Sequence, residues 1–171
     1  EDMTFDEMCD ALLNKYPEVH YLFFNGNNRG NFKFTNNYNL SYGTTSGYGG
    51  NTTLTMNDNL IFILNSGAGA GVNAAIVTDV YDLTNFNYIT FKYTLSMPRN
   101  DNATQGTIFF SKSLGLPTTT TKIYIFHKAQ LQTSGELSID ISSLSGQQYI
   151  GFNLALNQAN STATFELEYI Y

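Results

Sequence analysis

Two carboxylates near the end of the sequence come closest to a catalytic pattern. Glu166 and Glu168 stand in an alternating segment, so both project from one face of one strand, roughly 7 Å apart. Retaining glycosidases use two carboxyl groups about 5–5.5 Å apart. Such sites usually gather further acids and aromatic platforms, whereas this chain has no Trp and no third carboxylate in the segment. We therefore interpret the pair as solvated acids on an outer or edge strand, and we predict that the chain is not an enzyme.

Three other kinds of functional site are not supported by the spacing or context of their residues. Gly67, Gly69 and Gly71 read G-x-G-x-G before a β-branched segment, whereas a dinucleotide site needs G-x-G-x-x-G at the start of a helix. His20 and His127 are too few for a His-rich metal centre, and their strand-like surroundings are typical of core or interface histidines. No G-x-S-x-G turn supplies a serine nucleophile.

Thiol and metal chemistry is restricted by composition. Cys9 is the only cysteine, so no intramolecular disulfide can form, and its place in an apolar stripe favours a buried hydrophobic role. No EF-hand loop is present, which leaves open a structural calcium ion assembled across the fold, with unknown ligands. No other cofactor is predicted. The acidic residues near expected loops, which keep a calcium site possible, are Asp58, Asp79, Asp82, Asp101 and Asp140.

Two polar, turn-rich segments have the composition of a saccharide site. Sugar binding needs an aromatic face for the C–H groups and amides or charged groups for the hydroxyls, and binding residues tend to collect in loops. The alternative, that these tyrosines cover the ends of the fold or an oligomer interface, stays open. The candidate carbohydrate-binding residues are Tyr38, Tyr42, Tyr48, Arg99, Asp101 and Asn102.

The charge distribution excludes several partners. The net charge is −6, of which −5 falls in residues 1–18 and −1 in the remainder. Because the main body has no basic stripe, a nucleic-acid partner is not expected. No apolar run approaches the roughly 18 residues of a membrane helix, so membrane insertion is not expected either. No basic stretch precedes an apolar one at the start, so we expect no signal peptide.

One helix is predicted, over residues 4–16, within an N-terminal segment of residues 1–18. Thr4 and Glu7 fit a capping box, apolar residues follow at helical spacing, and Pro17 ends the pattern. The apolar stripe needs a partner. We expect it to pack on the apolar run 60–64 or to mediate self-association, for example as a trimer.

After Pro17 the apolar period changes from 3.6 to 2, which predicts an antiparallel β-sandwich or barrel over residues 19–171. No helical crossover is present, which argues against a parallel α/β sheet. The predicted strands are 19–24, 31–35, 38–42, 52–56, 59–64, 73–79, 87–97, 106–112, 122–128, 136–141, 148–156 and 162–171.

One phrase occurs twice: Asp-Leu-Thr from Asp82 and Asp-Ile-Ser from Asp140, each followed by a short turn and a long alternating strand. A short acceptor at this position can bond backbone N–H groups in an Asx turn and fix the register. We interpret the phrase as scaffold and expect the recognition residues in loops that do not repeat.

The alternation of the long strands predicts which residues face the core. The expected core residues are Ile89, Phe91, Tyr93, Leu95, Ile150, Phe152, Leu154, Leu156, Phe165, Leu167, Tyr169 and Tyr171. Gly151, Asn153 and Ala155 are expected to face outward.

The two phrases, with Tyr-Ile-Gly-Phe after the second, resemble a jelly-roll module of the kind found in carbohydrate-binding domains and in tail and baseplate (receptor-binding) proteins of phages. The resemblance covers roughly residues 75–171 and transfers no binding residue. It implies an all-β, antiparallel two-sheet jelly-roll sandwich with a short N-terminal α-helix. It also implies a non-catalytic adhesion module for host cell-surface carbohydrate, located in a virion tail or outside the cell.

Two alternatives stay open. One is a purely structural tail subunit whose aromatic loops contact other subunits, as a homo-oligomer or with other tail proteins. The other is a carbohydrate-binding domain of a secreted bacterial glycanase.

Overall fold

The N-terminal helix begins with the predicted capping box. The computed structural model describes residues 2–15, 19–34, 51–68, 71–98, 104–113, 120–127, 130–131 and 134–171. Helix α1 spans Phe5–Lys15. The Thr4 N–H donates to Glu7 Oε2 at 2.7 Å, and the Glu7 N–H donates to Thr4 Oγ1 at 3.2 Å. Each side chain thus satisfies a backbone donor that lacks a partner in the first turn.

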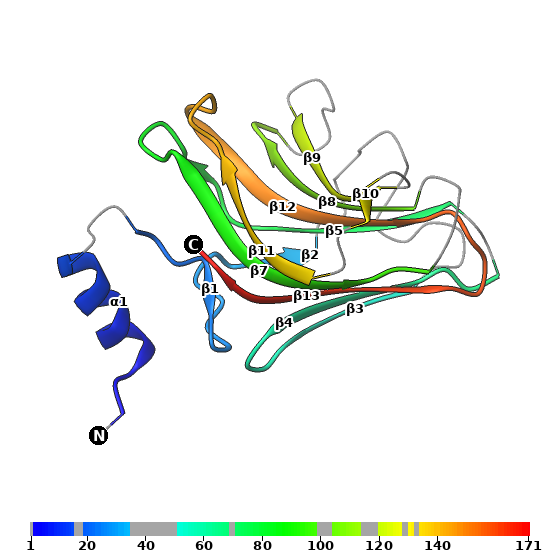
Figure 1. Cartoon of the computed structure of the whole chain (residues 1–171), viewed down its shortest axis with the longest axis horizontal. Coiled ribbons are helices and arrows are strands. Elements are labelled where there is room, and N and C mark those ends of the chain that lie inside the picture. Colours follow the sequence, from blue (N-terminus) through cyan, green and yellow to red (C-terminus); the bar gives the residue numbers. More distant parts are fainter. Residues whose placement is uncertain are drawn as a thin grey trace.

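The strands form two antiparallel sheets (Figure 1). Among the described residues, six strands build one sheet in the order β11–β7–β13–β4–β3, with β1 paired to β13. Its members are β1 (Phe23–Phe24), β3 (Asn51–Met56), β4 (Leu60–Asn65), β7 (Tyr88–Ser96), β11 (Ser134–Asp140) and β13 (Thr162–Ile170).

Seven of the described strands build the second sheet in the order β10–β9–β8–β12–β5–β2, with β6 paired to β12. Its members are β2 (Lys33–Phe34), β5 (Val72–Val77), β6 (Tyr81–Asp82), β8 (Gln105–Ser111), β9 (Thr120–His127), β10 (Gln130–Leu131) and β12 (Gln147–Leu156). Successive described strands change sheet at β1/β2, β2/β3, β4/β5, β6/β7 and β7/β8, and at each step from β10 to β13. The fold is therefore an all-β, two-sheet jelly-roll sandwich with a short helix, as predicted.

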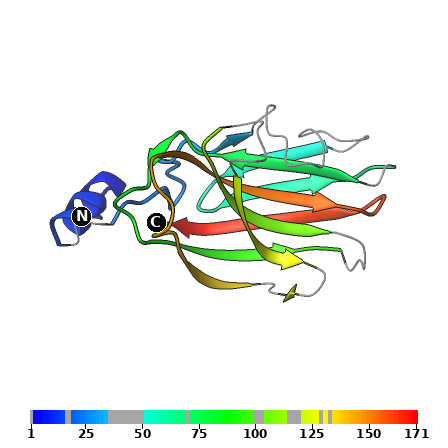
Figure 2. The same ribbon diagram turned by 90° about the horizontal axis from the view of Figure 1, so that it is seen from above.

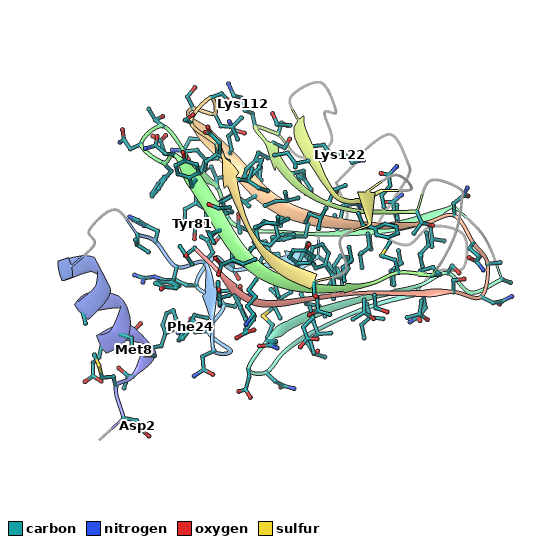
Figure 3. All side chains as sticks on the ribbon, in the orientation of Figure 1. Asp2, Met8, Phe24, Tyr81, Lys112 and Lys122 are labelled. Carbon is teal, nitrogen blue, oxygen red and sulfur yellow. The ribbon has the colours of Figure 1, made fainter. Side chains whose placement is uncertain are left out.

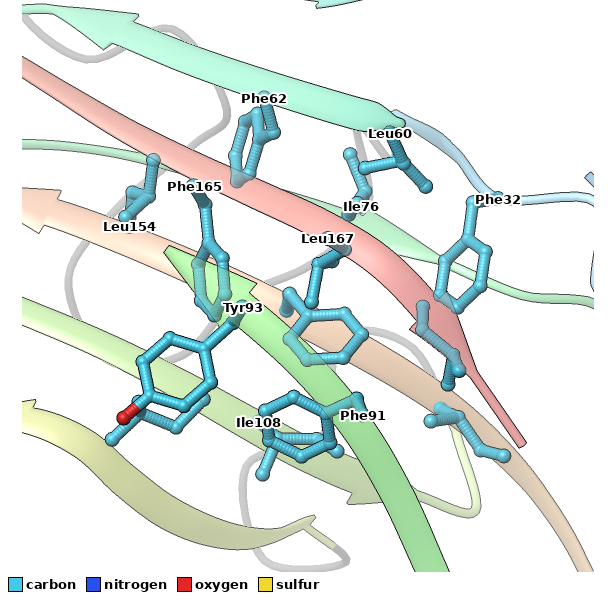
Figure 4. Close-up of a cluster of buried hydrophobic side chains, with 14 of the residues drawn as sticks. Phe32, Leu60, Phe62, Ile76, Phe91, Tyr93, Ile108, Leu154, Phe165 and Leu167 are labelled. Atoms are coloured by element: carbon cyan, nitrogen blue, oxygen red, sulfur yellow. The ribbon is translucent and has the colours of Figure 1, made fainter. Parts of the chain in front are cut away.

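Aromatic side chains from both sheets meet in the core (Figure 4). Phe152 lies at the centre, with its ring centroid 5.4 Å from that of Phe91 and 5.2 Å from that of Phe165. Both pairs are edge-on, and such contacts contribute about 0.5–1.5 kcal/mol each beyond the burial of apolar area. The alternation predicted for β7 is confirmed, with Ile89, Phe91, Tyr93 and Leu95 buried.

The outer face of the seven-stranded sheet is buried as well. Gly151, Asn153 and Ala155 face away from the core, as predicted, but they are not exposed. Phe109 on the neighbouring strand lies across Gly151, and Phe109 forms a second apolar cluster with Ala75 and Val77. Period-2 alternation identifies the two faces of a strand but not what covers each of them.

A β-bulge reverses the faces at the end of β13. Leu167 pairs with Tyr93, whereas Tyr169 pairs with Lys92, so Glu168 is the extra residue. The prediction that Tyr169 and Tyr171 enter the core is therefore wrong. Ile170 is fully buried instead, and the Tyr169 hydroxyl donates to a carboxylate oxygen of Glu136.

The doubled phrase forms two Asx turns with the same internal bonds. Asp82 Oδ1 accepts the Thr84 N–H at 3.0 Å and the Thr84 hydroxyl at 2.6 Å. Asp140 Oδ1 accepts the Ser142 N–H at 2.9 Å and the Ser142 hydroxyl at 2.6 Å. The predicted role of both aspartates in strand entry is confirmed.

The two turns also hold each other. The Leu83 N–H donates to the Gly146 carbonyl at 3.1 Å, and the Ile141 N–H donates to the Asn87 carbonyl at 2.8 Å. The residue after each aspartate thus bonds the far end of the opposite turn. The Gly146 N–H adds a third link to Thr84 Oγ1 at 3.0 Å.

The helix lies beyond one end of the sandwich, at the same end as β1 and the last residue of the chain (Figure 1 and Figure 2). Phe5 stacks on Phe24 of β1, with ring centroids 6.0 Å apart. The expectation that the helix packs on the apolar run of β4 is therefore wrong. The division of the chain at residues 18 and 19 stays a prediction.

The contact of Phe109 with Gly151 predicts an intolerant site. A Cβ at position 151 would meet the Phe109 ring and lie 2.7 Å from the Ile76 carbonyl oxygen. We expect Gly151→Ala to lower the free energy of unfolding by about 1–3 kcal/mol in urea denaturation. Gly106→Ala is the matched control, because its Cβ would meet the end of the Leu95 side chain and no backbone atom, so it should cost less. Equal costs for both variants would contradict this packing.

The two turns predict an acid-sensitive contribution to stability. Hydrogen bonds from Thr84 and Ser142 lower the pKa of Asp82 and of Asp140. A lowered folded-state pKa contributes stability above the unfolded-state pKa of about 3.9, and this contribution is lost as the pH falls through the folded-state pKa. We expect the Asp82→Asn/Asp140→Asn double variant to lose less stability than the unsubstituted chain between pH 6 and pH 2. The charge-matched control is Asp2→Asn/Asp10→Asn, and identical losses in both double variants would refute the role of the turns.

Candidate functional site

The carbohydrate-binding residues predicted from the sequence cannot be placed. All six lie outside the described residues, so they stay predictions: Tyr38, Tyr42, Tyr48, Arg99, Asp101 and Asn102. The described part of the chain contains a different candidate site, a pocket at the end of the sandwich that carries the two Asx turns. We call it the end pocket. It encloses about 280 Å³, which is at the small end of the range for ligand sites.

Aliphatic side chains from both sheets form the floor of the end pocket. Each is at most 6% exposed, and they come from four separate parts of the fold. The floor residues are Leu22, Leu83, Ile89, Ile141 and Ile150. Leu83 and Ile141 are the apolar residues that follow the aspartates of the doubled phrase.

Aromatic rings and amides form the walls and rim. Val19, Tyr81, Phe86 and Tyr171 are half-buried in the walls, and Figure 3 shows Tyr81 at the same end of the sandwich as Phe24. Tyr88 is 61% exposed at the rim. The rim also carries His20, Asn85 and Asn87, all exposed, and Thr90 completes the lining.

The Asx turn at Asp82 positions most of the rim. Phe86 donates its N–H to the Leu83 carbonyl at 3.1 Å, which closes the turn and sends Leu83 inward and Asn85 outward. The rings of His20 and Phe86 pack in a T-shaped arrangement, with their centroids 4.9 Å apart. His20 is exposed at the rim, so a core position is wrong for it, and an interface position stays a prediction.

The described lining of the end pocket contains no permanently charged side chain. None of its described lining residues is Asp, Glu, Lys or Arg. The nearby Asp79 carboxylate accepts hydrogen bonds from Asn31 and Lys33, which lower its pKa. Burial and, to a smaller extent, the Asp79 charge raise the pKa of Tyr81, so its phenol stays protonated at neutral pH. The pocket therefore fits an uncharged ligand.

The two glutamates of β13 lie elsewhere and have other contacts. Glu166 Oε1 accepts a hydrogen bond from Asn59 Nδ2 at 2.7 Å. Glu168, the bulge residue, forms an exposed ion pair with Lys92 at 3.0 Å. Both are on the outer face of the six-stranded sheet, as predicted, but β13 is a central strand and not an edge strand.

Three of the five residues considered for calcium have structural roles, whereas Asp58 is exposed and Asp101 lies outside the described residues. Asp79, Asp82 and Asp140 each accept hydrogen bonds from neighbouring side chains. Among the described residues, no three His, Cys, Asp or Glu side chains group as a metal site would require. Within the same residues, no helix is long and apolar enough to span a bilayer.

Comparisons with known proteins find similar solved structures but no similar sequence. No protein-family model matches the chain, and no curated protein matches it in sequence. A family 12 xyloglucanase from Bacillus licheniformis is similar in structure, with 10% identity, a TM-score of 0.49, and coverage of 89% of this chain and 96% of that one. A variant of a family 29 carbohydrate-binding module, in a complex with cellulohexaose, gives 11% identity, a TM-score of 0.41, and coverage of 82% of this chain and 90% of that one.

The tailspike protein 4 of bacteriophage CBA120 is also similar, with 13% identity and a TM-score of 0.36. The match covers 79% of this chain and 20% of the tailspike domain. The structures similar to this chain include carbohydrate-binding modules, glycanases and this phage protein. The topology above, and not these matches, establishes the fold.

The site was missed in the sequence because no motif marks it. Its lining comes from residues 19–22, 81–90, 141, 150 and 171. One signal was present: Asn85, Phe86, Asn87 and Tyr88 follow the first aspartate of the doubled phrase directly. The interpretation of that phrase as scaffold is incomplete, because both turns also line the end pocket.

Proposed function

We propose that this chain is a non-catalytic adhesion module that binds one residue of a neutral saccharide in the end pocket. The observation that carries the proposal is the combination of ring side chains with free amides around an uncharged cavity. Sugars have apolar C–H faces, which pack on rings such as Tyr88 and Tyr81, and hydroxyls, which amides can both donate to and accept from.

The rim amides are available for such contacts. The side chains of Asn85 and Asn87 are exposed, and neither bonds another residue in the described part of the chain. Each amide offers two donor hydrogens and one acceptor oxygen. Tyr88 is exposed beside them, and its ring presents apolar surface to water. Covering that ring with a sugar is therefore favourable.

The proposal places the module in a phage tail or baseplate, where it would attach the particle to carbohydrate on the host cell surface. The resemblance of the doubled phrase supports this setting. A carbohydrate-binding domain of a secreted glycanase would use the same pocket chemistry, and the genes beside this one distinguish the two. A purely structural tail subunit would bind no glycan, and its aromatic loops would lie at subunit contacts.

Glycan binding should depend on Tyr88. On an array of bacterial surface glycans, we expect the unsubstituted chain to bind and Tyr88→Ala to lose at least tenfold in affinity, because the ring covers the sugar. Tyr88→Phe is the matched control and should bind within about threefold. Binding that is lost in Tyr42→Ala or Tyr48→Ala but kept in Tyr88→Ala would assign recognition to the predicted loops. A uniformly negative array with a stable oligomer by light scattering would favour the structural subunit.

The non-catalytic part of the proposal has its own test. We expect no release of reducing ends from any array-positive glycan, and we expect Glu166→Gln to bind as tightly as the unsubstituted chain. Glu168→Gln serves as the control for the loss of one charge on the same strand. Hydrolysis that disappears in Glu166→Gln would show that the chain is an enzyme.

A further inference from the structure

The floor of the end pocket offers no polar group to a ligand. Its five side chains, those of Leu22, Leu83, Ile89, Ile141 and Ile150, are aliphatic. Thr90 lies beside them, but its hydroxyl is bonded to that of Ser138 at 2.9 Å. A ligand atom that reaches the floor therefore meets only hydrocarbon from side chains.

The backbone around the floor is also engaged. Leu22 donates its N–H to the Ile170 carbonyl at 2.8 Å and accepts the Gly30 N–H at 2.7 Å. Ile150 donates to Thr78 Oγ1 at 3.1 Å and accepts the Thr78 N–H at 2.8 Å.

The backbone groups of the two turns and of the last residue, Tyr171, are also hydrogen-bonded within the chain. The N–H groups of Leu83 and Ile141 form the bonds between the turns, and Thr90 and Tyr171 exchange two backbone bonds of 2.7 and 2.9 Å. A buried ligand hydroxyl at the floor would find no free N–H donor among these groups, and a poorly paired buried hydroxyl is costly.

We infer that the saccharide residue held in the end pocket carries a methyl group, which it places on the aliphatic floor while its ring hydroxyls meet Asn85 and Asn87 at the rim. This inference rests on the proposed function. Two classes of neutral sugar present such a methyl group: 6-deoxyhexoses, through C6, and N-acetylhexosamines, through the acetamido group. In both classes the methyl group projects from the ring, from C5 or through the C2 acetamido group, and other ring positions carry hydroxyls that can reach the rim.

The expected discrimination is large enough to measure. An apolar pocket distinguishes ligands that differ by one methylene by about 10-fold or more, and it rejects a hydroxyl in place of a methyl by up to roughly 100-fold. We therefore expect the methyl-bearing member of a matched pair to bind 10- to 100-fold more tightly.

The experiment uses pairs of reducing sugars, so that no aglycone methyl competes, in an NMR titration that follows the methyl signals of Leu83, Ile89 and Ile141. The 6-deoxy pairs are L-fucose against L-galactose and L-rhamnose against L-mannose. The amide pair is N-acetylglucosamine against N-formylglucosamine. We expect tight binding and shifts of the floor methyl signals with the methyl-bearing member of at least one pair. The pair that responds identifies the class.

Floor variants locate the effect. Ile141→Val removes one methylene from the floor and should reduce the preference for the methyl-bearing sugar about threefold or more. Ile139→Val is the matched control, because it makes the same change two residues away, at a partly buried position that does not line the pocket. The Ile139→Val variant should keep the full preference for the methyl-bearing sugar.

Three results would overturn the inference, and they differ in what else they overturn. Equal affinities within every pair, with Tyr88-dependent binding, reject the methyl preference and leave the proposed function standing. A preference that Ile139→Val lowers as much as Ile141→Val shows that the floor does not cause it. No binding by any sugar, on the array or in the titration, rejects the proposed function itself.

Discussion

The reciprocal bond between the two Asx turns is the constraint on which one end of this sandwich depends. The N–H of Leu83 and the N–H of Ile141 each bond the far end of the opposite turn. One turn leads into β7 and the other into β12, so these bonds join the entries of a long strand in each sheet. They link the two sheets at this end of the sandwich. They also fix the positions of Leu83 and Ile141, two floor residues of the end pocket, relative to each other.

Local signals in the sequence were sufficient where a few neighbouring residues determine the structure. Thr4 and Glu7 form their capping box whatever lies around the helix, and Asp82 and Asp140 each bond a residue two positions ahead. The alternation of β7 was equally informative, because a strand with one buried face must place an apolar residue at every second position. These features gave the fold class and the positions of most strands.

Other features depend on contacts between distant segments, and the sequence carried no sign of them. The bulge at Glu168 is visible only against the pairing of β13 with β7, yet it decides that Ile170 and not Tyr169 is buried. The burial of Gly151 depends on Phe109, which lies on another strand. The end pocket combines five segments, and only Asn85–Tyr88 could have drawn attention by composition.

The scattered origin of the pocket lining has a thermodynamic consequence. Because Leu22, Ile150 and Tyr171 come together only when both sheets and the ends of β1 and β13 are in place, the pocket exists in the native state and in no partly folded segment. A ligand that binds there is therefore linked to global unfolding, and at 100 times its Kd it would add about 2.7 kcal/mol to the stability of the whole sandwich. Copies of the chain with an occupied pocket would then resist unfolding and proteolysis better than copies with an empty one.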